Sequence, residues 1–208
     1  MTYLGISSGF HDAGITVIDS QGDIVLASHS ERYSKNKNDS QLHLDQFKEF
    51  DYSSVERISY YERPWLKQLR QVRSGQGIEW NKLTAKSVIK QQLPDLPITA
   101  PVQTNSHHKS HAAAGFQTSP YKDATVVVID AIGEFDTITI WHAEYDSKGY
   151  AKYKKLWSRG YPHSIGLFYS AMTKRAGLRP LDEEYILMGM SAYATVSYTH
   201  LTLPTTPY

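Results

Sequence analysis

The sequence predicts an α/β protein made of two related lobes, and the main reason is a repeated order of strands and turns. Alternating apolar residues and tight polar turns predict three strands within the first thirty residues. The same order recurs in the second half of the chain. The predicted strands cover residues 3–6, 14–19, 23–28, 124–130, 137–143 and 150–157.

The first turn of each set has a similar short sequence, GFHD at residues 9–12 and GEFD at residues 133–136. With the repeated order, this match predicts the duplicated lobes of an actin-like ATPase (ribonuclease H-like) fold, which holds phosphates between two hairpin turns. On the repeat alone, chance similarity of two hairpins is the alternative. We expect a first α/β lobe at residues 1–120 and a second, incomplete lobe at residues 121–194.

The connection between the two sets has a mixed pattern. A further strand is predicted at residues 57–61, and helices at residues 65–72 and 80–92. Residues 195–208 contain five threonines and no charged residue. We interpret them as a non-native tail, with a genuine edge strand as the alternative.

Composition excludes several classes of protein. The chain has 208 residues, no cysteine and a net charge of +1, with 22 basic and 21 acidic side chains. A disulfide framework or thiolate metal site is therefore excluded, and no concentrated basic field favours a nucleic-acid partner. No secretion signal and no apolar run of membrane-spanning length stand out, so we expect a cytoplasmic protein with no membrane partner.

A histidine-rich segment is the sharpest chemical signal. His107 and His111 are four residues apart on a predicted helix, the spacing that lets two imidazoles face one ion. His108 points about 100° away from them. Asp130, at the end of a predicted strand, offers a carboxylate as the third ligand. Two imidazoles and one carboxylate suit Fe2+ or a similar divalent metal; surface or capping histidines are the alternative.

Two glycines and one further histidine are weaker signals. Gly133 would let a ligand approach the backbone of an acidic turn, where successive amides bind anions. Gly166 stands at a predicted helix N-terminus, which also favours a phosphate. His11, in the first hairpin turn, is a candidate base for a hydroxyl nucleophile. Ordinary turns and strand-to-helix connections are the alternatives for all three.

These motifs together resemble the NodU/CmcH O-carbamoyltransferase family. The matching segments follow the family's order and span residues 3 to 194. They are FHDA at 10–13, ERYSKNK at 31–37, HHKSHAA at 107–113, VIDAIGE at 128–134, PHSIGLFY at 162–169 and EYILMGM at 184–190. The family usually has lysine where Ile186 stands, and this difference puts a cation contact there in doubt.

The resemblance implies an actin-like, threonylcarbamoyl-transferase-like N-terminal domain, followed by a YrdC-like C-terminal domain and one more metal-binding aspartate beyond residue 194. It implies ATP-dependent transfer of a carbamoyl group from carbamoyl phosphate, through carbamoyl-adenylate, to a hydroxyl of a small-molecule acceptor. We therefore expect that this chain alone does not complete the reaction. The alternatives are tRNA threonylcarbamoyl transfer and a non-catalytic metal- and nucleotide-binding module.

The resemblance also assigns roles to individual residues. His107, His111 and Asp130 match metal ligands, His11 matches the base, and Lys37 matches a residue at the acceptor side. The residues that match contacts of the nucleotide or carbamoyl-adenylate are Asp130, Ala131, Ile132, Gly133, Glu134 and Gly166.

Overall fold

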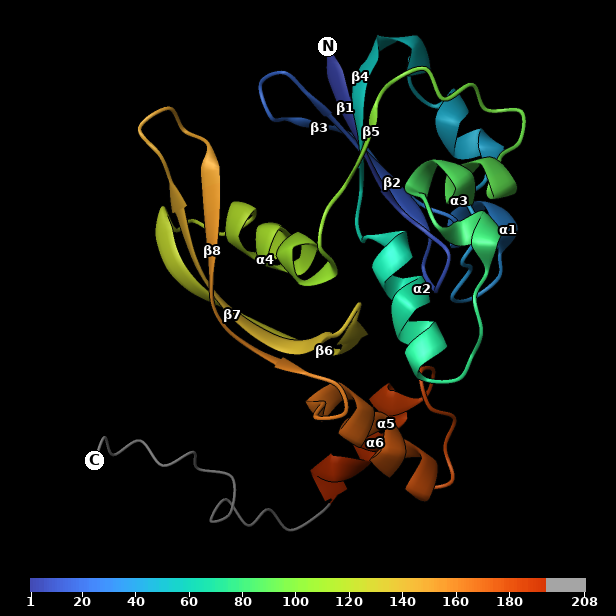
Figure 1. The fold of residues 1–208 in the computed structure, drawn as a ribbon, viewed down its shortest axis with the longest axis vertical. Coiled ribbons are helices and arrows are strands. Elements are labelled where there is room, and N and C mark those ends of the chain that lie inside the picture. Colours follow the sequence, from blue (N-terminus) through green and yellow to red (C-terminus); the bar gives the residue numbers. More distant parts are fainter. Residues whose placement is uncertain (194–208) are drawn as a thin grey trace.

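The computed structural model describes residues 1–193, and it contains two β-sheets with helices around them (Figure 1). The predicted tail at residues 195–208 lies outside the described residues. No helix in the described part of the chain has both the length and the apolar character needed to cross a membrane. The predicted α/β class is confirmed.

The first sheet has five strands in the order β3-β2-β1-β4-β5. The first three strands form an antiparallel meander, and β4 and β5 continue the sheet in parallel with β1. This order and these directions are those of a ribonuclease H-like sheet. The strands are β1 (Thr2–Ser7), β2 (Gly14–Asp19), β3 (Ile24–His29), β4 (Val55–Tyr60) and β5 (Val102–Thr104).

One face of the first sheet carries the main hydrophobic core. Strand residues that alternate along the chain point into this core, among them Leu4 and Ile6 of β1, with Ile58 of β4 at its centre. Val88 and Ile89 cover them from a helix. The helical elements of this part are α1 (Glu31–Ser34), α2 (Pro64–Arg73), α3 (Ala85–Gln92) and the 3-10 turns at Leu44–Lys48, Tyr52–Ser54 and Trp80–Lys82.

The predicted helix at residues 80–92 is wrong in its first part. A short 3-10 turn occupies Trp80–Lys82, and the α-helix α3 starts only at Ala85. Thr84 explains the break, because its backbone is extended and its hydroxyl oxygen accepts a hydrogen bond from the amide of Ser87. An N-cap of this kind starts a new helix.

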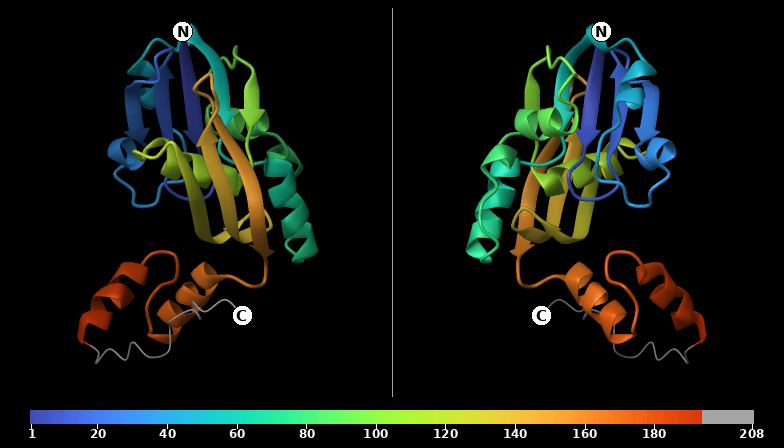
Figure 2. Two further views of the ribbon diagram at one scale, coloured as in Figure 1. Left: turned by 90° about the vertical axis from the view of Figure 1, so that its left-hand side faces the viewer. Right: turned by 90° about the vertical axis from the view of Figure 1, so that its right-hand side faces the viewer.

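The second sheet repeats the antiparallel meander of the first, in the order β6-β7-β8. Its strands are β6 (Asp123–Gly133), β7 (Asp136–Tyr145) and β8 (Ala151–Gly160). The remaining elements are α4 (His107–Gln117), α5 (Ile165–Arg175), α6 (Glu184–Met190) and the 3-10 turn Ser191–Tyr193. Figures 1 and 2 show α5 and α6 together at one end of this sheet.

Helix α4 connects the two sheets. It packs against β6 and β7 through a small core of Ala112, Val128 and Trp141. On its other side, the hydroxyl of Ser110 donates a 2.7 Å hydrogen bond to the carbonyl of Tyr61, just after β4. The predicted lobe boundary at residues 120 and 121 stays a prediction, and this helix lies on its N-terminal side.

Helix α5 is held very close to β6, and a glycine makes this possible. A Cβ atom at Gly166 would lie 2.6 Å from the backbone nitrogen of Ala131 and 2.9 Å from the carbonyl carbon of Asp130. Backbone atoms cannot move aside as a flexible side chain can. Gly166 therefore sets the distance between α5 and the end of β6.

We expect Gly166→Ala to destabilise the chain by about 1–3 kcal/mol, because the added methyl group forces the helix away from the strand. Gly115→Ala is the matched control, since it is also a helical glycine and a Cβ there meets nothing within 4 Å. That change should be neutral or stabilising by up to about 1 kcal/mol. Urea unfolding measures both, and equal stabilities would contradict the packing role.

Candidate metal and ligand site

Two histidines and one aspartate converge at the junction of α4 and β6. The Nε2 atoms of His107 and His111 lie 3.0 Å apart. Oδ2 of Asp130 lies 3.0 Å from Nε2 of His107 and 3.9 Å from Nε2 of His111. Ligand atoms about 2.1 Å from one ion lie roughly 3.0–3.4 Å from each other. The two separations that involve His107 have this spacing, and the 3.9 Å between His111 and Asp130 is about 0.5 Å longer.

The local structure of α4 places the two histidines on one face. Ser106 has an extended backbone at the N-cap, and the helix begins at His107. His108, Ala112 and Phe116, which are spaced four residues apart, form the buried stripe that packs toward the second sheet. The face next to this stripe carries His107 and His111.

The aspartate is positioned by an irregularity in its strand. The pairing of β6 with β7 breaks between Ile129 and Gly133, so the backbone at Asp130 leaves the regular ladder. Oδ1 of Asp130 accepts a 2.7 Å hydrogen bond from the backbone N–H of Ala131. Because this bond fixes one oxygen, the other oxygen is held toward the histidines.

A buried carboxylate behind the trio, Glu62, was missed from the sequence. It stands two residues after β4, and its side chain is 6% exposed. Oε2 of Glu62 lies 3.7 Å from Nδ1 of His107, while Oε1 accepts a 2.9 Å hydrogen bond from Nζ of Lys67. Carboxylates commonly orient metal-binding histidines through a hydrogen bond. At 3.7 Å this contact is longer than a hydrogen bond, and the buried Nδ1 of His107 has no hydrogen-bond partner among the described residues. The position of Glu62 directly after a buried strand was the signal that could have found it.

The charges of the trio are set by their proximity. Burial lowers the pKa of His107, but the Asp130 and Glu62 carboxylates outweigh it and raise that pKa to about 9. Burial raises the pKa of Asp130, but the hydrogen bond and charge of His107 outweigh it and lower that pKa to about 2. Partial burial and the neighbouring His107 lower the pKa of His111. At neutral pH His107 is therefore protonated, whereas His111 is neutral.

The rings of His107 and His108 leave no room for a side chain at Gly133. A Cβ atom at Gly133 would lie 2.3 Å from Cδ2 of His107 and 2.8 Å from Cδ2 of His108. His108 is buried, and its Nδ1 lies 2.9 Å from the hydroxyl of Thr139. It does not join the trio, in agreement with its expected direction.

The other residues predicted to contact a nucleotide surround the same turn. Ala131 and Ile132 are half-buried between Asp130 and Gly133. Glu134 has a left-handed backbone with φ of 58° and a buried side chain. Both its oxygens accept hydrogen bonds from Arg63, one from Nη2 at 2.6 Å and one from Nε at 3.1 Å. The carboxylate of Glu134, in the β6–β7 turn, therefore links the second sheet to the segment that follows β4.

His11 and Lys37 lie on the first-sheet side, and no polar contact within residues 1–193 joins either of them to the trio. The side chain of His11 is 56% exposed and that of Lys37 is 87% exposed. A hollow of about 300 Å3 lies beside this hairpin turn, and Gly9, Phe10 and Glu62 are among its lining residues. Glu62, which lies 3.7 Å from His107, is the lining residue that faces the trio, and none of His107, His111 and Asp130 lines the hollow itself.

Comparison with known proteins decides the family. A family model described as the carbamoyltransferase N-terminus matches residues 76–203. The chain belongs to this family. The matched part of the chain includes α4, β6 and the whole histidine–aspartate trio.

An uncharacterized protein of Synechocystis sp. is 31% identical over 234 aligned residues. The match covers 96% of this chain, which spans about 36% of that relative's length. Two solved structures are similar at a lower level. One is the activator of 2-hydroxyisocaproyl-CoA dehydratase from Clostridium difficile with bound ADPNP. It is 10% identical, the match covers 95% of this chain and 59% of that one, and the TM-score is 0.43. The other is a Listeria monocytogenes protein proposed to be an N-acetylmannosamine kinase, which is 12% identical, with 94% of this chain and 72% of that one covered and a TM-score of 0.41.

We expect metal binding at the trio to release about one proton at pH 7.5. His107, with its pKa of about 9, must lose its proton to become a ligand, whereas His111 is already neutral. Affinity for Zn2+ should therefore rise about tenfold per pH unit and level off above pH 9. Titration calorimetry in buffers of different ionisation enthalpy measures the proton count.

His142→Ala is the matched control for His111→Ala, because His142 belongs to a second group of possible ligands, with Asp123 and Glu144, on the surface. The first change should leave Zn2+ binding intact, and the second should abolish it. Tight binding without proton release, or binding that survives in His111→Ala, would contradict the assignment.

Proposed function

We propose that the protein containing this chain transfers a carbamoyl group from carbamoyl phosphate to a hydroxyl of a small-molecule acceptor, with ATP and through carbamoyl-adenylate. In this proposal the chain provides the metal-binding part and the nucleotide contacts. The observation that carries it is the convergence of His107, His111 and Asp130 in a member of the carbamoyltransferase N-terminal family.

The donor set fits a divalent metal. Two imidazole nitrogens and one carboxylate oxygen, with Glu62 behind His107, suit Fe2+ or a similar ion of intermediate softness. When bound, such an ion supplies Lewis-acid polarisation of a carbonyl or phosphoryl oxygen. Asp130 is already ionised at neutral pH because its pKa is about 2, so it adds negative charge that attracts a cation.

The backbone near the trio supports an anionic ligand. The left-handed backbone at Glu134 follows Gly133, and turns of this kind direct successive amides toward an anion. The N-terminus of α5 lies against Asp130 and Ala131, where Ser164 donates hydrogen bonds to both carbonyls. A helix start adds partial positive charge beside the ion site. We assign the adenylate phosphate to this corner.

The acceptor is assigned to the first hairpin. His11 is proposed to remove the proton from the acceptor hydroxyl as its oxygen attacks the carbamoyl carbon, and AMP then leaves. Lys37 is proposed to bind the acceptor. Contacts of 3.9 Å or less link His11 to Lys37 through Asp12, His29 and Glu31, which supports placing both on one side.

Transfer to tRNA is the second candidate within the fold, but the near balance of 22 basic and 21 acidic side chains does not favour it. A non-catalytic metal- and nucleotide-binding module is the candidate from another class. Both are outcomes of one assay, in which the full-length protein receives carbamoyl phosphate, ATP, Fe2+ and either small hydroxyl acceptors or tRNA.

We expect His11→Ala to retain metal and adenine-nucleotide binding in the full-length protein and to lower the transfer rate by about 10²–10⁴-fold, the usual contribution of a general base. Chromatography of the carbamoylated product measures the rate. His142→Ala is the control, since this surface histidine lies outside the family motifs and the proposed base and ligand set. Full activity in His11→Ala would remove His11 from the mechanism, and binding without transfer to any acceptor would favour the non-catalytic module.

A further inference from the structure

The first hairpin turn carries an aspartate that the proposed reaction has not used. Nδ1 of His11 lies 2.8 Å from Oδ2 of Asp12. Oδ1 of Asp12 lies 3.6 Å from Nε2 of His29, and Nδ1 of His29 lies 3.9 Å from Glu31. The carboxylate of Asp12 thus stands between two imidazoles, and only the contact to His11 is short enough for a hydrogen bond.

We propose that Asp12 is a positioning residue for His11. Its carboxylate accepts the Nδ1 proton of the imidazole and so favours the tautomer in which Nε2 carries the free lone pair that a base needs. This inference rests on the proposed function, in which His11 is the base, and it adds the residue that fixes the proton of that base.

The backbone holds the pair in place even though both side chains are partly exposed. The amide of Gly9 donates a 2.9 Å hydrogen bond to the carbonyl of Ser40, and the amide of Ala13 donates one of 2.7 Å to the carbonyl of Asp39. These two bonds fix the turn on both sides of His11 and Asp12. The contact between His11 and Asp12 therefore lies in a turn whose backbone is held on both sides.

Asp12 itself has a left-handed backbone, with φ of 51°. A residue other than glycine adopts this conformation at an energetic cost, and aspartate and asparagine tolerate it best. Strained conformations of this kind concentrate at functional sites. The strain also dictates the test, because asparagine fits the same backbone while alanine does not.

A metal ion is the competing explanation, since Asp12, His29 and Glu31 offer ligand atoms within 4.8 Å of one another. Two contacts oppose it. Oδ2 of Asp12 is taken by His11, and the two ring nitrogens of His29 face different carboxylates. Removing metal with EDTA separates the two explanations, because the contact between His11 and Asp12 needs no ion.

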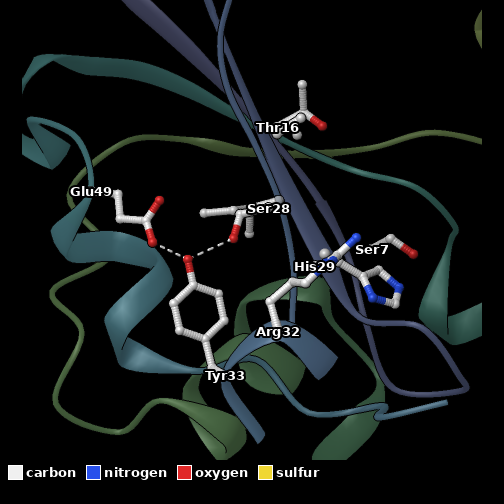
Figure 3. Close-up of a pocket in the computed structure, with 11 residues that line it drawn as sticks. Ser7, Thr16, Ser28, His29, Arg32, Tyr33 and Glu49 are labelled. Atoms are coloured by element: carbon white, nitrogen blue, oxygen red, sulfur yellow. Dashed lines mark hydrogen bonds between the residues drawn. The ribbon is translucent and has the colours of Figure 1, made fainter. Parts of the chain in front are cut away.

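His29 also lies at the edge of an open hollow of about 590 Å3 on the first sheet, near Ser7 (Figure 3). Thr16 and Ser28 line the same hollow. The side chain of His29 is 37% exposed. It is a neighbour of the pair, and the tautomer of His11 depends on Asp12.

The test is the tautomer of His11 in the EDTA-treated chain, measured by long-range 1H–15N NMR on protein labelled at histidine nitrogen. The signals of His11 are assigned by their loss in His11→Gln. At a pH where the ring is neutral, we expect the Nδ1–H tautomer to dominate. In Asp12→Asn the amide can donate to Nδ1, so the Nε2–H tautomer should increase. Asp23→Asn, an exposed change of equal charge in the β2–β3 turn at the opposite end of the strands, should alter nothing.

The second arm is kinetic and uses the full-length protein. Asp12→Asn should lower kcat of carbamoyl transfer by about 10–100-fold with little change in the acceptor KM. An unchanged His11 tautomer in Asp12→Asn overturns the proposal, as does an unchanged kcat. If the wild-type protein transfers no carbamoyl group, the proposed function fails, while the NMR result still decides whether Asp12 sets the tautomer.

Discussion

The adjacent side chains of Glu62 and Arg63, which follow β4, connect the first sheet to α4 and to the second sheet. Glu62 contacts His107 on α4, and Arg63 forms a two-pronged ion pair with Glu134 in the β6–β7 turn. The amide of Arg63 adds a third hydrogen bond to the same carboxylate at 2.8 Å. The histidines on α4 and the β6–β7 turn, which are the two ends of the candidate site, therefore both contact the segment that directly follows β4.

This connection is strong because the acidic partners are buried. The side chain of Glu134 is 7% exposed, and Glu134 raises the pKa of Arg63 through a hydrogen bond and its charge. Removing Arg63 would leave the buried carboxylate of Glu134 without compensation. Because the side chain of Arg63 is 38% exposed, the cost lies below the value of about 3–5 kcal/mol for a fully buried pair. The pair also helps to maintain the left-handed backbone of Glu134, which places Gly133 against His107.

Local patterns predicted the elements that carry the chemistry. The four-residue spacing of His107 and His111 and the strand before Asp130 were sufficient to expect that they converge, and the structure brings them together. The repeated meander was also visible in the strand order. The roles of Glu62 and Arg63 were not visible in the sequence. Their partners lie 45 and 71 residues further along the chain, and adjacent glutamate and arginine residues look like an ordinary surface pair.

The glycines show a different limit of sequence interpretation. Gly133 and Gly166 were taken as places where a ligand approaches the backbone, whereas the nearest atoms to their missing Cβ belong to His107 and to Ala131. A required glycine reveals that something lies close, and the sequence does not say whether it is a ligand or the protein. The same applies to α4, whose apolar stripe predicts burial but not that the second sheet covers it.

The central claim is that His107, His111 and Asp130 bind one divalent ion. Anomalous diffraction from crystals of the protein grown with Zn2+ or, without oxygen, Fe2+ tests it most directly. We expect one strong peak about 2.0–2.2 Å from Nε2 of both histidines and from Oδ2 of Asp130. No peak at this position, or a peak only at the surface group of Asp123, His142 and Glu144, would contradict it.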